Sequence, residues 1–207
     1  MPFALVSSAI IQDIDVMRKS GLASLAFYYF DFREDRKKDQ RGLLASMLVQ
    51  LCHQSDSYCD ILFNFYLEHD RGLRRPSDDA LATCLKDLIK IQGQVPVYLI
   101  VDALDECPNT FSMPSPREKV LILLEELVDS RLPNLHICVT SRSELDIKTV
   151  LDPLTFRSVS LHDESGQMGD IDHYIQSVVN TDPIMRKWKA EHKQLVIDTL
   201  TKNADGM

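Results

Sequence analysis

The amino-acid sequence predicts an α/β fold with a mainly parallel sheet flanked by helices, followed by a helical C-terminal segment. Two observations predict this class. An apolar run without polar alternation occurs at 97–101, a mostly apolar run at 135–139, and an apolar and aromatic run at 22–32; such runs are typical of strands covered by helices on both faces. Between these runs, apolar residues recur with helical spacing, and strands that alternate with helices indicate parallel pairing.

In the first half of the chain, helices are expected where apolar residues recur three or four positions apart, at 10–17, 43–51, 61–67 and 81–89. The first should end before Gly21, because glycine commonly follows the last turn of a helix. The last should begin after Ser77, whose hydroxyl can cap a helix N-terminus. The strand at 22–32 lies between the first two helices, and a charged loop at 33–39 follows it.

The second half of the chain contains a clear helix start. The sequence SPRE at 115–118 is a capping-box pattern with proline at the first helical position, and it predicts a helix through 120–128. Two further helices and one strand are expected, at 171–178, 195–200 and 156–161. We divide the chain into a core at 1–165 and a helical segment at 166–207.

The charge and apolar content of the chain argue against some classes of function. Its net charge is −8, which disfavours a general affinity for nucleic acid or for an anionic membrane. No run approaches the roughly 18 apolar residues of a membrane span, and no signal-peptide pattern opens the chain, so we expect a cytoplasmic protein. The five cysteines are odd in number and lie in apolar segments, which is typical of buried, reduced thiols.

Three carboxylates follow the apolar run at 97–101, namely Asp102, Asp105 and Glu106. Open α/β sheets bind ligands at the carboxyl ends of their strands, and buried carboxylates need a cation or hydrogen-bond donors. Mg²⁺ suits this place, because it takes a few carboxylate contacts together with water and phosphate oxygens. The simpler alternative is a strand that ends in a solvated acidic turn.

Four segments of the sequence resemble parts of NACHT domains. YLIVDALDE at 98–106 resembles their Walker B region, and LPNLHICVTSRSE at 132–144 resembles the following strand and sensor region. LAFYYFDFRED at 25–35 is similar to their second strand, and ADGM at 204–207 to the start of a motif beyond the nucleotide domain. Nearly the whole chain is similar to fungal NACHT proteins with nephrocystin-like N-terminal domains, which are STAND-class P-loop NTPases.

The resemblance implies roles for five side chains. Asp102 would hold Mg²⁺ through water, and Asp105 and Glu106 would orient or activate the attacking water. Thr140 and Arg142, at the tip of the neighbouring strand, would sense the γ-phosphate of ATP or GTP. The intact domain would then be a nucleotide-dependent signalling switch that works with ankyrin, WD or helical repeat domains, and the segment after residue 165 would lead into a truncated following domain.

The phosphate-binding loop that such a site needs is missing. Its motif, G-x-x-x-x-G-K-S/T, occurs nowhere in the sequence, and the aligned positions 1–3 carry methionine, proline and phenylalanine. We therefore expect a chain that is incomplete at both ends and hydrolyses no nucleotide by itself. The strand before the loop is missing too, unless residues 3–6 or another chain fill its place. At the sensor, Ser143 replaces a proline, and Arg142 has the simpler alternative of pairing with Glu144 at the surface.

Other functions stay open. A non-enzymatic interaction module would use the same core to dock other proteins, or to self-associate by strand addition at the gap in the sheet. A metal-dependent phosphatase or nuclease would need a second acidic strand end, which the sequence lacks. A zinc site at Cys52, His53, Cys59 and His69 is disfavoured, because these residues lack the paired spacing of structural zinc ligands.

Overall fold

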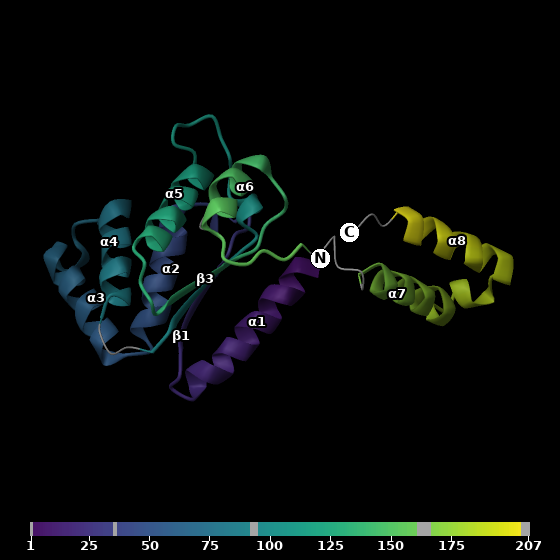
Figure 1. Ribbon diagram of the computed structural model, residues 1–207, viewed down its shortest axis with the longest axis horizontal. Helices are drawn as coiled ribbons and strands as arrows, with labels where there is room; N and C mark the ends of the chain where they lie inside the picture. Colours follow the sequence, from purple (N-terminus) through teal and green to yellow (C-terminus); the bar gives the residue numbers. More distant parts are fainter. Residues whose placement is uncertain (1, 35–36, 92–94, 161–166, 204–207) are drawn as a thin grey trace. The chain divides into compact units, whose positions relative to one another are not determined.

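The computed structural model describes residues 2–34, 37–91, 95–160 and 167–203. It divides into two compact units, Met1–Thr155 and Phe156–Met207 (Figure 1). The first unit contains a parallel sheet with helices around it, so the predicted α/β class is confirmed. The boundary that the sequence places after residue 165 stays a prediction. None of the helices in these described ranges is long and apolar enough to cross a membrane.

The sheet of the first unit has three parallel strands in the order β1-β2-β3. They are β1 (Ser24–Tyr29), β2 (Val97–Asp102) and β3 (Leu135–Val139). Phe27 of β1 lies opposite Ile100 of β2, which in turn lies opposite Cys138 of β3. This register brings the carboxyl ends of β2 and β3 to the same edge of the sheet, where β2 ends in Asp102.

Helices cover both faces of the sheet (Figure 1). On one side pack α2 (Gln40–Cys52), α3 (Asp56–Glu68), α4 (Asp78–Ile89) and α5 (Pro116–Asp129). On the other face, α1 (Pro2–Lys19) crosses β1 and β2. A short helix, α6 (Leu145–Leu151), follows β3 and contacts α5.

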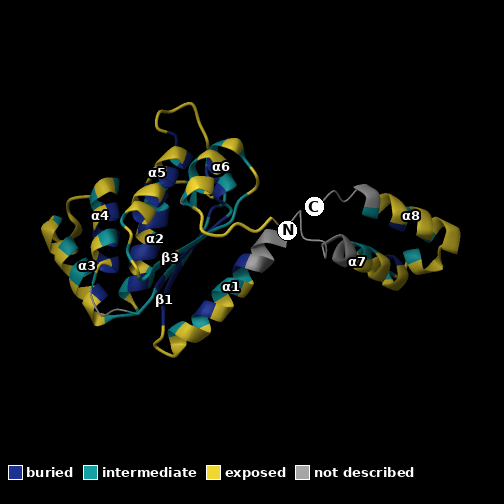
Figure 2. Cartoon of the chain, in the orientation of Figure 1, coloured by how far each residue is buried: buried dark blue, intermediate teal, exposed yellow. Residues whose placement is uncertain are grey.

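The main hydrophobic core lies between the sheet and the α2–α5 side. Tyr28 and Val101 face this core from the strands. The buried residues of α2 are Leu43, Leu44, Met47, Leu48 and Leu51. Each large apolar side chain buried here contributes about 1.5–3 kcal/mol, and Figure 2 shows such buried positions in dark blue along α2 and α5. A smaller cluster joins Ile14 of α1 to Leu25 and Ile100 on the opposite face.

Two helix starts follow the predicted capping chemistry. The Ser77 hydroxyl accepts the N–H of Ala80 at 3.1 Å. The Ser115 hydroxyl accepts the N–H of Glu118 at 3.1 Å, and the Glu118 carboxylate accepts the N–H of Ser115 at 3.2 Å. These bonds satisfy N–H groups that have no partner inside the helix. Both predicted caps are confirmed.

One expected strand is wrong, and one alternative is not what the structure has. Residues 156–160 form no regular secondary structure, and the Phe156 side chain is fully exposed; Leu161, the end of the predicted strand, lies outside the described residues. The physical reason is that Phe156 and Val159 are both exposed, so the described part of this segment buries no apolar face against a neighbouring element. Residues 3–6 do not fill a place in the sheet either, since they belong to the helix α1.

The second unit is a helical hairpin. Helix α7 (Gln167–Thr181) packs on α8 (Ala190–Asn203), which confirms the helices predicted at 171–178 and 195–200. Val179 and Ile197 are buried between them. Two helices alone cover little surface, and larger apolar side chains of this unit stay exposed, among them Tyr174, Ile184, Leu195 and Leu200.

Candidate functional site

The carboxyl edge of the sheet holds a buried carboxylate between two hydroxyl groups. Asp102, the last residue of β2, is only 5% exposed. Its Oδ1 accepts a hydrogen bond from Thr140 Oγ1 at 2.5 Å and another from the hydroxyl of Ser7 in α1. Burying a carboxylate is costly unless donors satisfy it. Here donors from α1 and from the end of β3 meet it, so the site connects three elements of the fold.

The backbone turns sharply after Asp102. Ala103 adopts a left-handed conformation, with φ of 55° and ψ of 47°, which costs a residue other than glycine roughly 1–2 kcal/mol. The cost is offset by hydrogen bonds that continue β2–β3 pairing past the strand ends. The N–H of Ala103 donates to Thr140 Oγ1 at 3.1 Å, and the N–H of Leu104 donates to the Thr140 carbonyl at 3.0 Å.

Because of this turn, Asp105 and Asp102 bind different residues. Asp105 Oδ1 accepts the backbone N–H of Arg142 at 3.0 Å, and its Oδ2 lies 3.4 Å from Arg142 Nε. The Arg142 side chain is 78% exposed, so this ion pair sits at the surface. The alternative pairing of Arg142 with the Glu144 side chain is not what the structure has, because that carboxylate pairs with Arg117.

Arg117 is the residue of this region that the sequence interpretation missed. It is only 5% exposed, and its guanidinium donates to the carbonyls of Cys107 at 2.9 Å and Asp105 at 2.6 Å. It also pairs with Glu144 and, at 3.2 Å, with Asp146. Burial alone would lower the pKa of Arg117, but the hydrogen bonds to the two carboxylates outweigh burial and raise it. Arg117 thereby fixes the loop that carries Asp105.

A sequence signal for Arg117 did exist. The residue stands in the first turn of α5, two positions after the capping Ser115. A positive charge is unfavourable there, because the N-terminus of a helix carries the positive end of its dipole. A basic residue at such a position indicates that acidic partners compensate it.

The three predicted carboxylates therefore do not share one centre. Asp102 is bound by hydroxyls and Asp105 by Arg142, while the Glu106 side chain has no hydrogen bond or ion pair within the described ranges. Across the described residues, no group of three His, Cys, Asp or Glu side chains is arranged to hold a metal ion. The structure brings Thr140 to Asp102 and Arg142 to Asp105, and the predicted chemical roles of these residues stay predictions.

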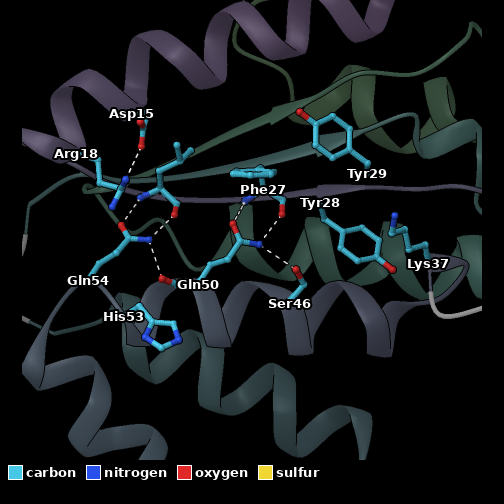
Figure 3. A pocket seen from close by; sticks show the side chains of 11 residues that line it. Asp15, Arg18, Phe27, Tyr28, Tyr29, Lys37, Ser46, Gln50, His53 and Gln54 are labelled. Carbon is cyan, nitrogen blue, oxygen red and sulfur yellow. Dashed lines mark hydrogen bonds and ion pairs between the residues drawn. The ribbon is translucent and has the colours of Figure 1, made fainter.

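A cavity of about 520 Å³ lies along the outer edge of β1 (Figure 3). Asp15 and Arg18 of α1, Phe27 and Tyr29 of β1, and residues of α2 line it. None of the five predicted site residues is part of its lining. The cavity exists because β1 is the last strand on this side of the described sheet, so α1 and α2 approach its edge without closing over it.

Two glutamines at this cavity bind the free edge of β1, and we name them the glutamine clamp. Gln54 accepts the N–H of Leu25 at 2.9 Å and donates to its carbonyl at 2.6 Å. Gln50 does the same at Phe27, with distances of 3.1 and 2.7 Å (Figure 3). Gln50 lies in the last turn of α2 and Gln54 two residues beyond its end, and their amides meet residues of β1 that are two positions apart, about 6.6 Å along a strand. The clamp therefore replaces a neighbouring strand at the edge of the sheet.

Comparison with known protein families identifies the family of the chain. A family model described as nephrocystin 3, N-terminal, matches residues 4–142, about two thirds of the chain. The chain belongs to the nephrocystin 3 N-terminal family. The match runs from α1 through β3 to Arg142, so it includes all five predicted site residues. This nephrocystin 3 N-terminal family member has no match among curated proteins or solved structures.

Proposed function

We propose that this nephrocystin 3 N-terminal family domain is the core of a nucleotide-dependent signalling switch of the NACHT and STAND type. One observation carries the proposal. The buried carboxylate of Asp102 stands at the carboxyl end of the central strand, where α/β sheets bind ligands, and no cationic side chain pairs with it within the described ranges. Both hydroxyls bind Oδ1, which leaves Oδ2 to accept a hydrogen bond from a water of hydrated Mg²⁺.

The neighbouring residues have complementary roles in this proposal. The Thr140 hydroxyl holds Asp102 in one orientation. Asp105 and Glu106 orient the attacking water, and the exposed guanidinium of Arg142 leaves Asp105 to meet the γ-phosphate of ATP or GTP. When bound, Mg²⁺ would neutralise charge that develops on the phosphates. Arg142 thus has two alternative anionic partners, Asp105 and the γ-phosphate. The loop after β3, which carries Arg142, would change conformation with the nucleotide state and act as the moving part of the switch.

Tight nucleotide binding also needs a phosphate-binding loop, and the sequence contains no G-x-x-x-x-G-K-S/T. We therefore expect the 207-residue chain to bind magnesium nucleotides weakly and to hydrolyse none. Calorimetric titration of the purified chain with MgATP and MgGTP measures this; micromolar affinity would contradict it.

The switch itself is tested by adding a phosphate-binding loop. A variant with an apolar strand and a glycine-rich lysine loop placed before Ser7 should gain magnesium-dependent nucleotide binding. The Asp102→Asn change in that variant should remove the magnesium dependence, and Asp129→Asn, at the exposed end of α5, serves as a matched control that should not. A loop-bearing chain that unfolds cooperatively but binds neither nucleotide would overturn the proposal.

A second function, a non-enzymatic interaction module, is favoured by a different observation. Four side chains of the candidate site already bind one another in pairs, Thr140 with Asp102 and Arg142 with Asp105. Such a core could act by docking onto repeat proteins or a second copy in the cytoplasm. Light scattering after size exclusion discriminates self-association, since a monomer at all concentrations counts against it. An assembly that forms equally well with Asp102→Asn would favour the module over the switch.

A further inference from the structure

The five cysteines of the first unit differ in exposure. Cys84 and Cys107 are buried, and burial raises their pKa to about 11 and about 12. Cys138 is half-buried, and burial raises its pKa as well. Cys59 is exposed and Cys52 is half-buried. The expectation of buried thiols holds for Cys84 and Cys107 and is wrong for Cys59, because the α2–α3 turn that carries Cys59 lies at the surface.

Cys52 and Cys59 face each other across the α2–α3 turn. Cys52 is the last residue of α2, and Cys59 lies in the first turns of α3. Their Sγ atoms are 3.0 Å apart, and the Cys59 thiol lies 2.9 Å from the Cys52 carbonyl, to which it donates. A disulfide bond is about 2.05 Å long, so the sulfurs need to approach by only about 1 Å.

The surrounding contacts hold the two sulfurs in this position. Only residues 53–55 connect the helices. Gln54 in this connection is fixed to the edge of β1 by the glutamine clamp. The carbonyl of Ser55 accepts the N–H groups of Tyr58 and Cys59, both at 3.1 Å, and the Tyr58 side chain is completely buried. The turn is thus anchored on both sides, and the thiols are aligned before any bond forms.

We propose that Cys52 and Cys59 form a reversible disulfide that closes the α2–α3 turn, with a low-molecular-weight disulfide such as oxidised glutathione as the oxidant. The exposed Cys59 thiolate attacks one glutathione sulfur, and the other glutathione leaves as a thiolate. Cys52 then gives up its proton and attacks Cys59 Sγ, which releases the second glutathione. Two protein thiols are oxidised, one glutathione disulfide is reduced to two thiols, and the two protons pass to the released glutathiones.

The order of the two steps follows from the surroundings of each thiol. Cys59 meets solvent and is the sulfur that a soluble oxidant reaches first. Burial, together with the neighbouring Cys59, raises the pKa of Cys52 to about 11, so Cys52 is a poor initial nucleophile. It acts as the resolving thiol, because once Cys59 carries glutathione its sulfur is directly adjacent. A zinc site is not an alternative here, since the described residues supply no third ligand.

The test uses the whole chain, reduced and then equilibrated with glutathione buffers of increasing oxidised fraction. After unfolding and alkylation, mass spectrometry of peptides should show Cys52 joined to Cys59, while the other three cysteines are alkylated. In Cys52→Ser, Cys59 should stop at the glutathione mixed disulfide, and Cys138→Ser, the matched control, should cross-link as the parent does. Alkylation of all five cysteines in oxidised glutathione, or glutathione retained on Cys59 in the parent chain, would overturn the proposal.

A second readout tests whether the sulfurs are aligned in advance. The oxidised chain should unfold at a higher temperature than the reduced chain, because the closed turn restricts the unfolded ensemble. Cys52→Ser, which forms no intramolecular bond, should show no such rise under the same buffers. An oxidised chain that melts below the reduced one would mean that the bond strains the turn, and would refute the alignment argument.

Discussion

The replacement of Arg117 by methionine tests how the loop that carries Asp105 is held. Methionine fills a similar, unbranched volume without any donor. The change leaves the carbonyls of Cys107 and Asp105 without their partners, at about 1–3 kcal/mol for each unsatisfied group. Glu144 and Asp146 are 42% and 36% exposed, so water replaces their bonds and they add only about 0–1 kcal/mol. We expect a loss of about 3 kcal/mol in the free energy of unfolding.

Urea unfolding followed by two probes measures this loss. Far-UV circular dichroism follows the helices of both units, whereas Trp188, the only tryptophan, reports on the Phe156–Met207 unit. The dichroism transition of Arg117→Met should fall to lower urea with an unchanged slope, and the Trp188 transition should stay. Arg75→Met, at an exposed arginine, is the matched control and should change stability by less than about 0.5 kcal/mol. A loss below about 1 kcal/mol in Arg117→Met would refute the reasoning.

Three further outcomes are expected. Gln50→Met with Gln54→Met removes the four bonds of the glutamine clamp and should cost about 1–3 kcal/mol in urea unfolding, with increased self-association in light scattering. Thr140→Val removes a donor to the buried carboxylate that ends β2 and should lower the free energy of unfolding by about 1–3 kcal/mol. Hydrogen bonds from Arg33 lower the pKa of Asp31 to about 2; Arg33→Met should return this pKa towards its ordinary value, as carboxyl carbon shifts in an NMR titration would report. Because the folded-state pKa of Asp31 is depressed, its contribution to stability is complete above the ordinary value and is lost as the pH falls towards 2.

Each of these outcomes has a control. Gln176→Met, on α7, removes a side-chain bond to Asp172 and should leave association unchanged; equal association in the Gln176 variant and in the Gln50 and Gln54 double variant would argue that the clamp does not protect the β1 edge. Thr83→Val, on the exposed face of α4, should cost little, and a comparable loss there would remove the special role of Thr140. An Asp31 titration that is the same with and without Arg33 would contradict the ion-pair explanation.

Local chemistry made part of the fold predictable. The caps at Ser77 and Ser115 depend on neighbouring residues alone, and β3 occupies 135–139 as predicted. The apolar run at 22–32 yielded a shorter strand, since β1 ends at Tyr29 and the following residues form the charged turn around Asp31. Periodicity carries no information on whether a second layer exists, and for that reason the expected strand at 156–161 was wrong.

Parallel strand pairing made one part of the candidate site predictable. Asp102 and Thr140 follow adjacent parallel strands, so their proximity follows from the sheet. Asp105 pairs separately because the backbone takes a left-handed conformation at Ala103. An alanine in the sequence gives no signal of that conformation. Gln50 and Gln54 escaped notice for a related reason. A polar side chain on a helix has the same appearance in a sequence whether it meets water or the backbone of a strand.

The two edge strands of the sheet differ in whether a further strand can pair with them. Along β1, side-chain amides occupy backbone positions that an incoming strand would need; along β3, the border strand on the other side, the described part of the chain supplies no such amide. If two molecules joined through β3, each outer edge of the combined sheet would be a β1 strand already bound by Gln50 and Gln54, and no further strand could add there. The glutamine clamp thus opposes strand addition along β1, the step by which exposed sheet edges build fibres.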